Sequence, residues 1–418
     1  MQIRPASFFF AAFLVISSAM APLCIAQERA WQGWELWKQG RVGDALRAAG
    51  AVLADQPADN DALHVRTLAL FVQGKYREAL DSFGRISRQY QKRGDLGLTM
   101  LEAYYHLNKP EDALGLAKEL DLKELGFYEA RAGKPFKVNA ERTYLLPFVA
   151  DPKVPLQFWP GLAGKINGQS VGMRFDTGAP FLTMGKEKAE SLGIPLFTSG
   201  PGVAGSRDVT VWNGLAERVE LGDGLVFENV PVSVLPKLDW VIFGTNLLEP
   251  FLATVDYPNS RFILTPRVRP ELHSAHRAMV PARQFKMPFF LWGDHYMFGQ
   301  GVFGEHDGLN LFFDSGLIAL TPINGKIVQA AFSASKERLI AWGFPENELT
   351  ATRFFETRRP LGIPGLLQEN TLVYFNANQP YDRVFGGVRI DGLVSHAWLS
   401  SYSWTIDFDA REYSFGVK

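Results

Sequence analysis

The chain has 418 residues, with 43 lysines and arginines against 44 aspartates and glutamates, so its formal net charge is −1. This balance does not favour nucleic acid or an acidic membrane surface as a partner. Cys24 is the only cysteine, and a chain cut after it would have no disulfide, no catalytic thiolate and no Cys-ligated metal. The seven histidines show no metal-ligand spacing, so neither a metal nor a cofactor is expected.

Residues 1–26 have the pattern of an export signal. Arg4 is the only charged residue, an apolar stretch runs from Phe8 to Ala21, and small residues precede a cleavage point after Ala26. We therefore expect a periplasmic or secreted protein. The alternative is an uncleaved N-terminal anchor, the one case in which a membrane would be a partner. A lipoprotein cysteine at position 24 is disfavoured by the bulky Leu23.

Residues 28–121 are predicted to be helical, because Ala, Leu, Arg and Glu are abundant there and β-branched residues are sparse. Small and turn-forming residues recur in this region every 34 positions. They are Ala45, Ala79 and Ala113, and Gly40, Gly74 and Asn108. Thirty-four residues is the tetratricopeptide period, so the segment is predicted to be a tetratricopeptide-like repeat module. An ordinary stack of helical hairpins is the alternative. Repeats of this type usually offer a concave face to a protein partner.

The rest of the chain is predicted to be an all-β body of two lobes. Residues 122–153 are punctuated by glycine and proline and are expected to be a linker or packing segment. Short alternating apolar runs separated by turn residues fill 154–267 and again 282–418. The proline-rich stretch from Pro266 to Pro281 is the expected boundary between the lobes.

The two lobes carry the same landmarks in the same order, which indicates an internal duplication. Each has an acidic triplet, a helix-like segment, an apolar pair closed by a small residue, and a later aspartate. The landmarks are Asp176-Thr177-Gly178 and Asp314-Ser315-Gly316, Ile242-Phe243-Gly244 and Leu393-Val394-Ser395, and Asp256 and Asp407. The copies lie 138 residues apart at the triplets and 151 at the later landmarks. One insertion of about a dozen residues after Asp314 explains this difference.

Two paired carboxyls that share one proton supply both a base and an acid, which is what amide hydrolysis without a metal or nucleophile needs. The hydroxyls of Thr177 and Ser315 are placed to bond the opposite loop, and Gly178 and Gly316 let the two backbones approach. The final acids, Asp256 and Asp407, are expected to end strands rather than to take part in chemistry.

These motifs resemble the retropepsin-like aspartic peptidases. In lobe 1 the resemblance runs from Ile166 to Leu248 in the order of that family, and in lobe 2 it is looser. It implies an exported aspartic endopeptidase with Asp176 and Asp314 as the catalytic dyad, and a peptide or protein substrate between the lobes. Two triplets in one chain favour the monomeric, pepsin-like arrangement over a dimer of lobe 1, which remains an alternative.

Several residues depart from the family pattern. Ser395 replaces a glycine and is expected to crowd the loop under Asp314, and Leu317 follows the second triplet where a small residue is usual. The flap is expected between Gly200 and Trp212, with Trp212 in place of a tyrosine. These departures leave open a catalytically inactive, peptidase-like binding or scaffold protein. The remaining expectation is that His295 and His306 lie on the surface.

Overall fold

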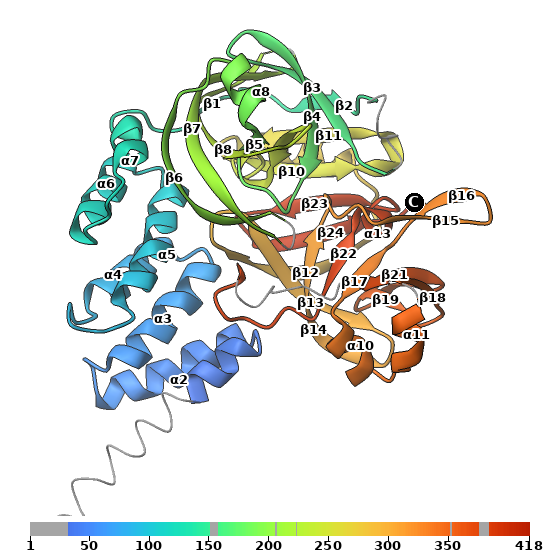
Figure 1. Ribbon diagram of the computed structural model, residues 1–418, viewed down its shortest axis with the longest axis horizontal. Coiled ribbons are helices and arrows are strands. Elements are labelled where there is room, and N and C mark those ends of the chain that lie inside the picture. The colour runs from blue at the N-terminus through green and yellow to red at the C-terminus, as the bar shows by residue number, and fades with distance from the viewer. Residues whose placement is uncertain (1–31, 151–157, 205–206, 223, 352, 376–383) are drawn as a thin grey trace, which may run out of the picture.

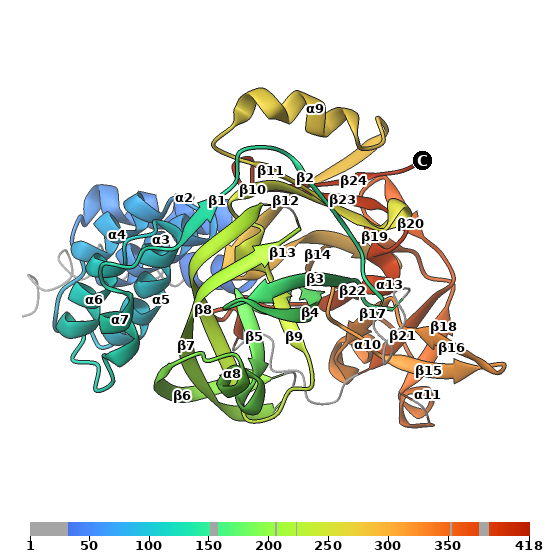
Figure 2. The same cartoon turned by 90° about the horizontal axis from the view of Figure 1, so that it is seen from above.

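The computed structural model describes residues 32–150, 158–204, 207–222, 224–351, 353–375 and 384–418. The expected export segment, residues 1–26, lies outside the described residues. The described chain forms a helical module beside a β-rich body of two lobes (Figures 1 and 2). None of the described helices combines the length and the apolar character that a membrane crossing requires.

The N-terminal module is built of helices that pack in chain order. A helix over residues 32–38 is followed by α2 (Val42–Asp55), α3 (Asn60–Val72), α4 (Tyr76–Gly84), α5 (Arg93–His106) and α6 (Pro110–Glu119). Gly40, Gly74 and Asn108 join these helices in pairs, with φ of 71°, 76° and 52°. A left-handed backbone suits glycine and asparagine, so the 34-residue spacing corresponds to three helix-turn-helix pairs.

The segment 122–153 does more than connect the module to the body. It contains α7 (Gly126–Arg131), β1 (Lys137–Asn139) and β2 (Tyr144–Pro147). The helix α7 continues the module and contacts lobe 1, while β1 and β2 add strands to the two sheets of the body. The glycines and prolines that suggested a linker separate these short elements.

Lobe 1 is a closed β-barrel. Its strands are β3 (Gly161–Ile166), β4 (Gln169–Asp176), β5 (Leu182–Gly185), β6 (Leu196–Ala204), β7 (Arg207–Leu221), β8 (Leu225–Leu235) and β9 (Val241–Gly244). The order β8-β5-β9-β4-β3-β7 closes through an additional β7–β8 pairing. The helix α8 (Lys186–Ser191) follows β5, and the 3-10 helix η1 (Thr245–Leu247) follows β9.

Lobe 2 repeats the central pairings of lobe 1. Its elements include β12 (Gln284–Trp292), β13 (Tyr296–Phe303), β14 (His306–Asp314), β17 (Phe332–Ala334), α10 (Lys336–Ala341), β21 (Thr371–Phe375), β22 (Gly392–Ser395) and α13 (His396–Leu399). The strands β14 and β22 are parallel, as are β4 and β9, and β17 pairs with β21 and β22 as β5 does with β8 and β9. The duplication seen in the sequence is therefore a duplication of topology.

The inserted residues after Asp314 form a separate hairpin. Its strands are β15 (Leu320–Ile323) and β16 (Lys326–Gln329), which pair only with each other among the described strands. The hairpin projects from lobe 2 in both views (Figures 1 and 2). Lobe 2 also has α11 (Glu346–Ala351), β18 (Phe354–Thr357), β19 (Leu361–Ile363) and β20 (Leu366–Gln368) near its outer edge.

An antiparallel sheet joins the lobes. Lobe 1 contributes β10 (Phe251–Asp256) and β11 (Arg261–Pro266) together with β2, and lobe 2 contributes β12, β23 (Ser403–Asp407) and β24 (Glu412–Gly416). The chain crosses between them through η3 (Pro270–Leu272) and α9 (His273–Ala278). Asp256 and Asp407 end β10 and β23, and the buried Asp256 is bonded to Arg261 (2.9 Å) and Ser403 (2.8 Å). Both acids thus end strands, as the sequence predicts.

The helical module and lobe 2 share one hydrophobic core. Apolar side chains of the helices and the buried residues Phe298, Phe312, Phe385, Val388, Ile390 and Leu393 of lobe 2 belong to the same cluster. Trp37 packs against Trp292, with ring centroids 5.9 Å apart, and donates a hydrogen bond to the carbonyl of Gly386 (2.9 Å). The module is thereby fixed to the body.

Candidate active site

The two acidic triplets follow corresponding strands of the two lobes. Asp176 is the last residue of β4 and Asp314 is the last residue of β14. The parallel neighbours β9 and β22 place Gly244 level with Asp176 and Ser395 level with Asp314. Because the two lobes have the same topology, each delivers one aspartate to their junction.

Hydrogen bonds between the triplets lock the two loops together. The backbone N–H of Thr177 donates to Oγ of Ser315 (3.0 Å), and the N–H of Ser315 donates to Oγ1 of Thr177 (3.0 Å). The Thr177 hydroxyl in turn donates to the carbonyl of Phe313 (2.7 Å). All three residues are fully buried, so water does not compete for these bonds.

The glycines of the triplets make room for the opposite carboxyl group. A Cβ atom on Gly316 would lie 2.0 Å from Cγ of Asp176, and one on Gly178 would lie 3.0 Å from Oδ1 of Asp314. Each glycine also donates its N–H to the aspartate of its own loop, at 2.7 Å for Asp176 and 2.9 Å for Asp314. The structure therefore brings all six predicted site residues together.

The carboxyl groups of Asp176 and Asp314 lie close together, since a Cβ atom on Gly178 would be 3.1 Å from Oδ1 of Asp176 and 3.0 Å from Oδ1 of Asp314. Burial raises the pKa of both carboxyls, and the charge of Asp176 raises the pKa of Asp314 further, well above its ordinary value. For Asp176 the N–H of Gly178 and the hydrogen bond from Asp314 partly offset the effect of burial. Two carboxylates this close do not both ionise readily, so the pair is suited to share one proton.

Comparison with known proteins agrees with this geometry. Residues 162–247 match the family model of the aspartyl proteases. This part of the chain is therefore similar to the aspartyl proteases. The retropepsin-like resemblance of lobe 1 is thus confirmed. A retropepsin-like aspartic protease from Rickettsia conorii is a similar solved structure, with 21% identity over 31% of this chain and 92% of that chain and a TM-score of 0.23. No curated protein matches the chain at a significant level.

Ser395 does not crowd the second loop of the body, contrary to expectation. In lobe 1 a Cβ atom on Gly244 would lie 2.3 Å from the carbonyl oxygen of Ala179, so only glycine is accommodated. In lobe 2 the Ser395 hydroxyl donates to the carbonyl of Ala330 and accepts the N–H of Ala397 (3.0 Å). The serine takes part in the structure as the N-cap of α13.

Leu317 also has a defined place beside the second triplet. Its side chain is half-buried and packs against the core that lobe 2 shares with the helical module. Its backbone N–H donates to the backbone carbonyl of Asp314 (3.2 Å). The same N–H also opposes the rise in the pKa of the Asp314 carboxyl. Both departures from the family pattern are therefore accommodated.

The segment expected to be the flap lies on the β6–β7 hairpin, whose tip residues 205–206 are outside the described residues. Trp212 lies on β7 with the ammonium group of Lys186 4.9 Å from its ring centroid. It also lines a pocket together with Leu125 and Gly126 of the helical module. These contacts place Trp212 where the hairpin meets the module.

His295 is a site residue that the sequence analysis missed. It was expected on the surface, but only 6% of it is exposed, and its Nδ1 is bonded to Oδ1 of Asp294. The residue lies in the turn before β13, and β13 runs antiparallel to β14. That pairing places the turn beside the end of β14, where Asp314 lies. The pairing of these two strands could have been inferred from the duplicated topology. His306 is half-buried against Trp342.

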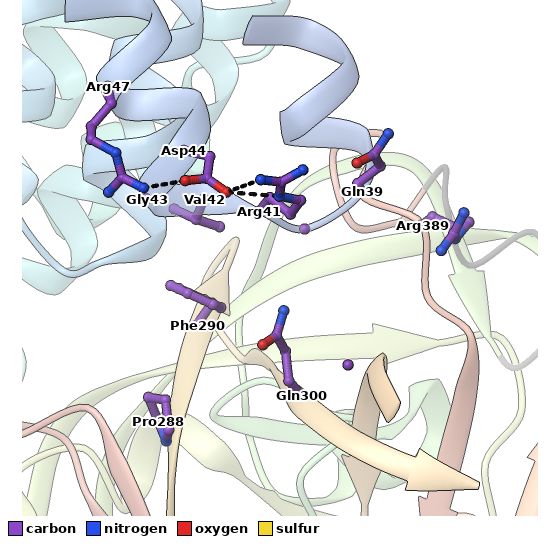
Figure 3. A pocket seen from close by; sticks show the side chains of 12 residues that line it. Gln39, Arg41, Val42, Gly43, Asp44, Arg47, Pro288, Phe290, Gln300 and Arg389 are labelled. Atoms are coloured by element: carbon purple, nitrogen blue, oxygen red, sulfur yellow. Dashed lines mark hydrogen bonds and ion pairs between the residues drawn. The ribbon is translucent and has the colours of Figure 1, made fainter. Parts of the chain in front are cut away.

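Other parts of the described chain offer no comparable chemistry. No cluster of three or more potential metal ligands is present among the described residues. A pocket of about 600 Å³ lies between the start of α2 and lobe 2 (Figure 3). Its charged groups are already paired, Asp44 with Arg41 and Arg47, and Arg389 with Asp391 (3.1 Å).

Proposed function

We propose that this protein is an exported aspartic endopeptidase whose catalytic dyad is Asp176 and Asp314. The observation that carries the proposal is the close approach of two carboxyls from two lobes, in a junction braced by Thr177 and Ser315. Both carboxyls come from one chain, so the pair needs no second copy of lobe 1. The signal-like residues 1–26 support export to the periplasm or beyond.

In the proposed mechanism Asp314 starts protonated and Asp176 starts ionised. A water molecule between the carboxyls gives a proton to Asp176 as its oxygen attacks the scissile carbonyl carbon. Asp314 donates its proton to the carbonyl oxygen, which yields a tetrahedral diol. Asp176 then protonates the leaving nitrogen, the C–N bond breaks, and a diol hydroxyl returns a proton to Asp314. The products are a carboxylic acid and an amine, and the dyad is restored.

The proposed substrate is an extended peptide or unfolded protein segment bound between the lobes by strand-like hydrogen bonds. The helical module is tetratricopeptide-like by its period. A protein partner of the module is a further part of this proposal.

The test is cleavage of an unstructured protein by the wild type and by Asp176→Asn and Asp314→Asn. Each substitution keeps the shape of the side chain and removes one carboxyl, so each is expected to abolish cleavage while circular dichroism stays unchanged. Asp307→Asn is the matched control, because Asp307 is exposed near the start of β14, at the end of the strand away from Asp314. Full activity in both single variants would overturn the dyad.

The alternative is a catalytically silent binding module. Ser395 and Leu317 suggest this alternative because they depart from the family pattern. Both residues are nevertheless accommodated beside the second triplet. This alternative predicts that the wild type binds peptides without cleaving them, which the same assay reveals. A dimer of lobe 1 would instead show activity that rises more steeply than in proportion to protein concentration.

A further inference from the structure

The turn between β12 and β13, residues 293–295, is a meeting point of the three parts of the molecule. From lobe 1, the Asn246 side chain donates to the carbonyl of Asp294 (2.5 Å). From the helical module, Nε2 of His106 on α5 lies 2.9 Å from the carbonyl oxygen of Gly293. A short turn that is bonded to two other parts of the chain has a fixed position.

The strand register places this turn beside the dyad. Phe298 on β13 is opposite Phe312 on β14, so Tyr296, two residues earlier, reaches the level of Asp314. Burial raises the pKa of the Tyr296 hydroxyl, and the charges of Asp294, Asp314 and Asp176 raise it further. The hydroxyl is therefore close enough to both dyad carboxyls to respond to their charge.

In this turn, one ring nitrogen of His295 is hydrogen-bonded and the other has no hydrogen-bond partner among the described residues. Its Nδ1 is bonded to Asp294, and its ring packs on Tyr296 with centroids 3.8 Å apart. Its Nε2 is buried and has no hydrogen-bond partner among the described residues. An orphan buried nitrogen costs free energy, and its retention at a candidate active site indicates a role there.

The charges of His295 and its neighbours interact. Burial alone would raise the pKa of Asp294, but the charge of His295 and the hydrogen bond between the two residues hold that pKa below its ordinary value. The charge of His295 likewise opposes the rise that burial gives to the pKa of Asp176. A protonated imidazole at this position thus favours the carboxylate form on both sides.

We propose that His295 is a positioning residue of the dyad: Asp294 fixes its ring beside the end of β14, where its unpartnered Nε2 is available to interact with Asp176. The inference rests on the proposed function, because it deepens the account of the same site. It makes the turn a third component of that site, beside the two triplets. The titratable groups that interact with His295 are Asp294 and Asp176, and those that interact with Asp294 are Tyr296, Glu102, Tyr105 and His106.

The helical module supports this arrangement through α5. His106 bonds the turn with one ring nitrogen and Glu249 of lobe 1 with the other (3.0 Å). Burial raises the pKa of Glu102, and the nearby charge of Asp294 raises it further. The module therefore helps to orient the turn that carries His295.

The first test does not depend on peptidase activity. NMR follows the titration of His295 in the wild type and in the double variant Asp176→Asn/Asp314→Asn, which removes the shared negative charge. The midpoint of His295 is expected to fall by about one pH unit, the lower end of the effect of a close opposite charge. Asp307→Asn should leave it unchanged. The signal is assigned by its loss in His295→Gln or, if that variant does not fold, in His295→Asn.

The second test uses the pH dependence of kcat/KM. In His295→Gln the acidic limb is expected to move about one unit to higher pH, because Asp176 then ionises less readily. Asp294→Asn should move it in the same direction, and His306→Gln should not move it. An unchanged His295 titration in the double variant, or profiles that superimpose, would overturn the inference. A protein that shows the titration shift but cleaves no peptide would instead overturn the proposed function and leave the coupling intact.

Discussion

The hydroxyl of Thr177 makes a sharp test of how the two lobes hold the site. Thr177→Val keeps the shape of the side chain but removes the oxygen that accepts the N–H of Ser315 (3.0 Å) and donates to the carbonyl of Phe313 (2.7 Å). Both abandoned groups are in fully buried residues. An unsatisfied buried group costs about 1–3 kcal/mol, so the two together should lower the free energy of unfolding by about 2–6 kcal/mol.

A second variant, in the opposite triplet, gives a stability loss to compare with that of Thr177→Val. Ser315→Ala leaves one group without its partner, the N–H of Thr177, and should cost about 1–3 kcal/mol, about half the loss in Thr177→Val. Urea denaturation followed by tryptophan fluorescence measures both losses. Thr210→Val, on an exposed position of β7, is the control and should change stability by less than about 0.5 kcal/mol. A Thr177→Val protein as stable as this control would refute the bracing role of the hydroxyl.

Three further predictions concern the dyad and the module. Gly316→Ala would place its methyl group 2.0 Å from Cγ of Asp176, so it should cost about 1–3 kcal/mol and abolish cleavage; an active variant would contradict the close approach of the loops. The pKa of Asp314 is raised by folding, so its contribution to stability is complete below the ordinary value of about 4 and is lost as the pH rises above it. Thermal unfolding should therefore show Asp314→Asn to be more stable, relative to the wild type, at pH 7 than at pH 4. An equal difference between variant and wild type at both pH values would contradict this reasoning. Trp37→Ala removes a fully buried side chain, should cost about 3–5 kcal/mol, and should expose the boundary between module and lobe 2 to limited proteolysis; unchanged protection would show that Trp37 does not fix the module.

The duplicated landmarks made the architecture of the body predictable. In each lobe, the acidic triplet marks the end of one apolar strand and the later apolar pair marks another. These two strands are parallel neighbours: β4 with β9 in lobe 1, and β14 with β22 in lobe 2. The offset between the copies located the one large insertion, which is the β15–β16 hairpin after Asp314. The glycine or asparagine at each helix turn was also predictable, because a left-handed φ restricts the residue type.

Contacts between distant segments were not predictable in the same way. His295 looked like a surface residue because it follows Gly293 and Asp294 in a turn. Its burial comes from α5 and from the residues after β9, which lie far away in the sequence. Ser395 appeared too large because the equivalent residue of lobe 1 must be glycine. The backbone of the inserted hairpin supplies its partner, Ala330, and no local pattern reveals that.

The face of the helical module that contacts the body limits where a partner binds. Trp37, Phe71 and His106 come from the first helix of each of the three pairs, and all three contact the β12–β13 region through Trp292 or Gly293. This region of the chain therefore occupies a face that repeats of this type would otherwise offer to another protein. A partner of the intact protein would have to use the second helices of the pairs.

The shared core also argues that module and body fold together. Six buried apolar residues of lobe 2 belong to the cluster of the module: Phe298, Phe312, Phe385, Val388, Ile390 and Leu393. Full burial of one such side chain contributes about 1.5–3 kcal/mol, so their exposure would cost up to about 9–18 kcal/mol. That is as large as the whole stability of a typical domain, about 5–15 kcal/mol. Removing the module would therefore endanger the fold of lobe 2 as well as the position of the turn that carries His295. In this chain the repeats act first as part of the body's own structure.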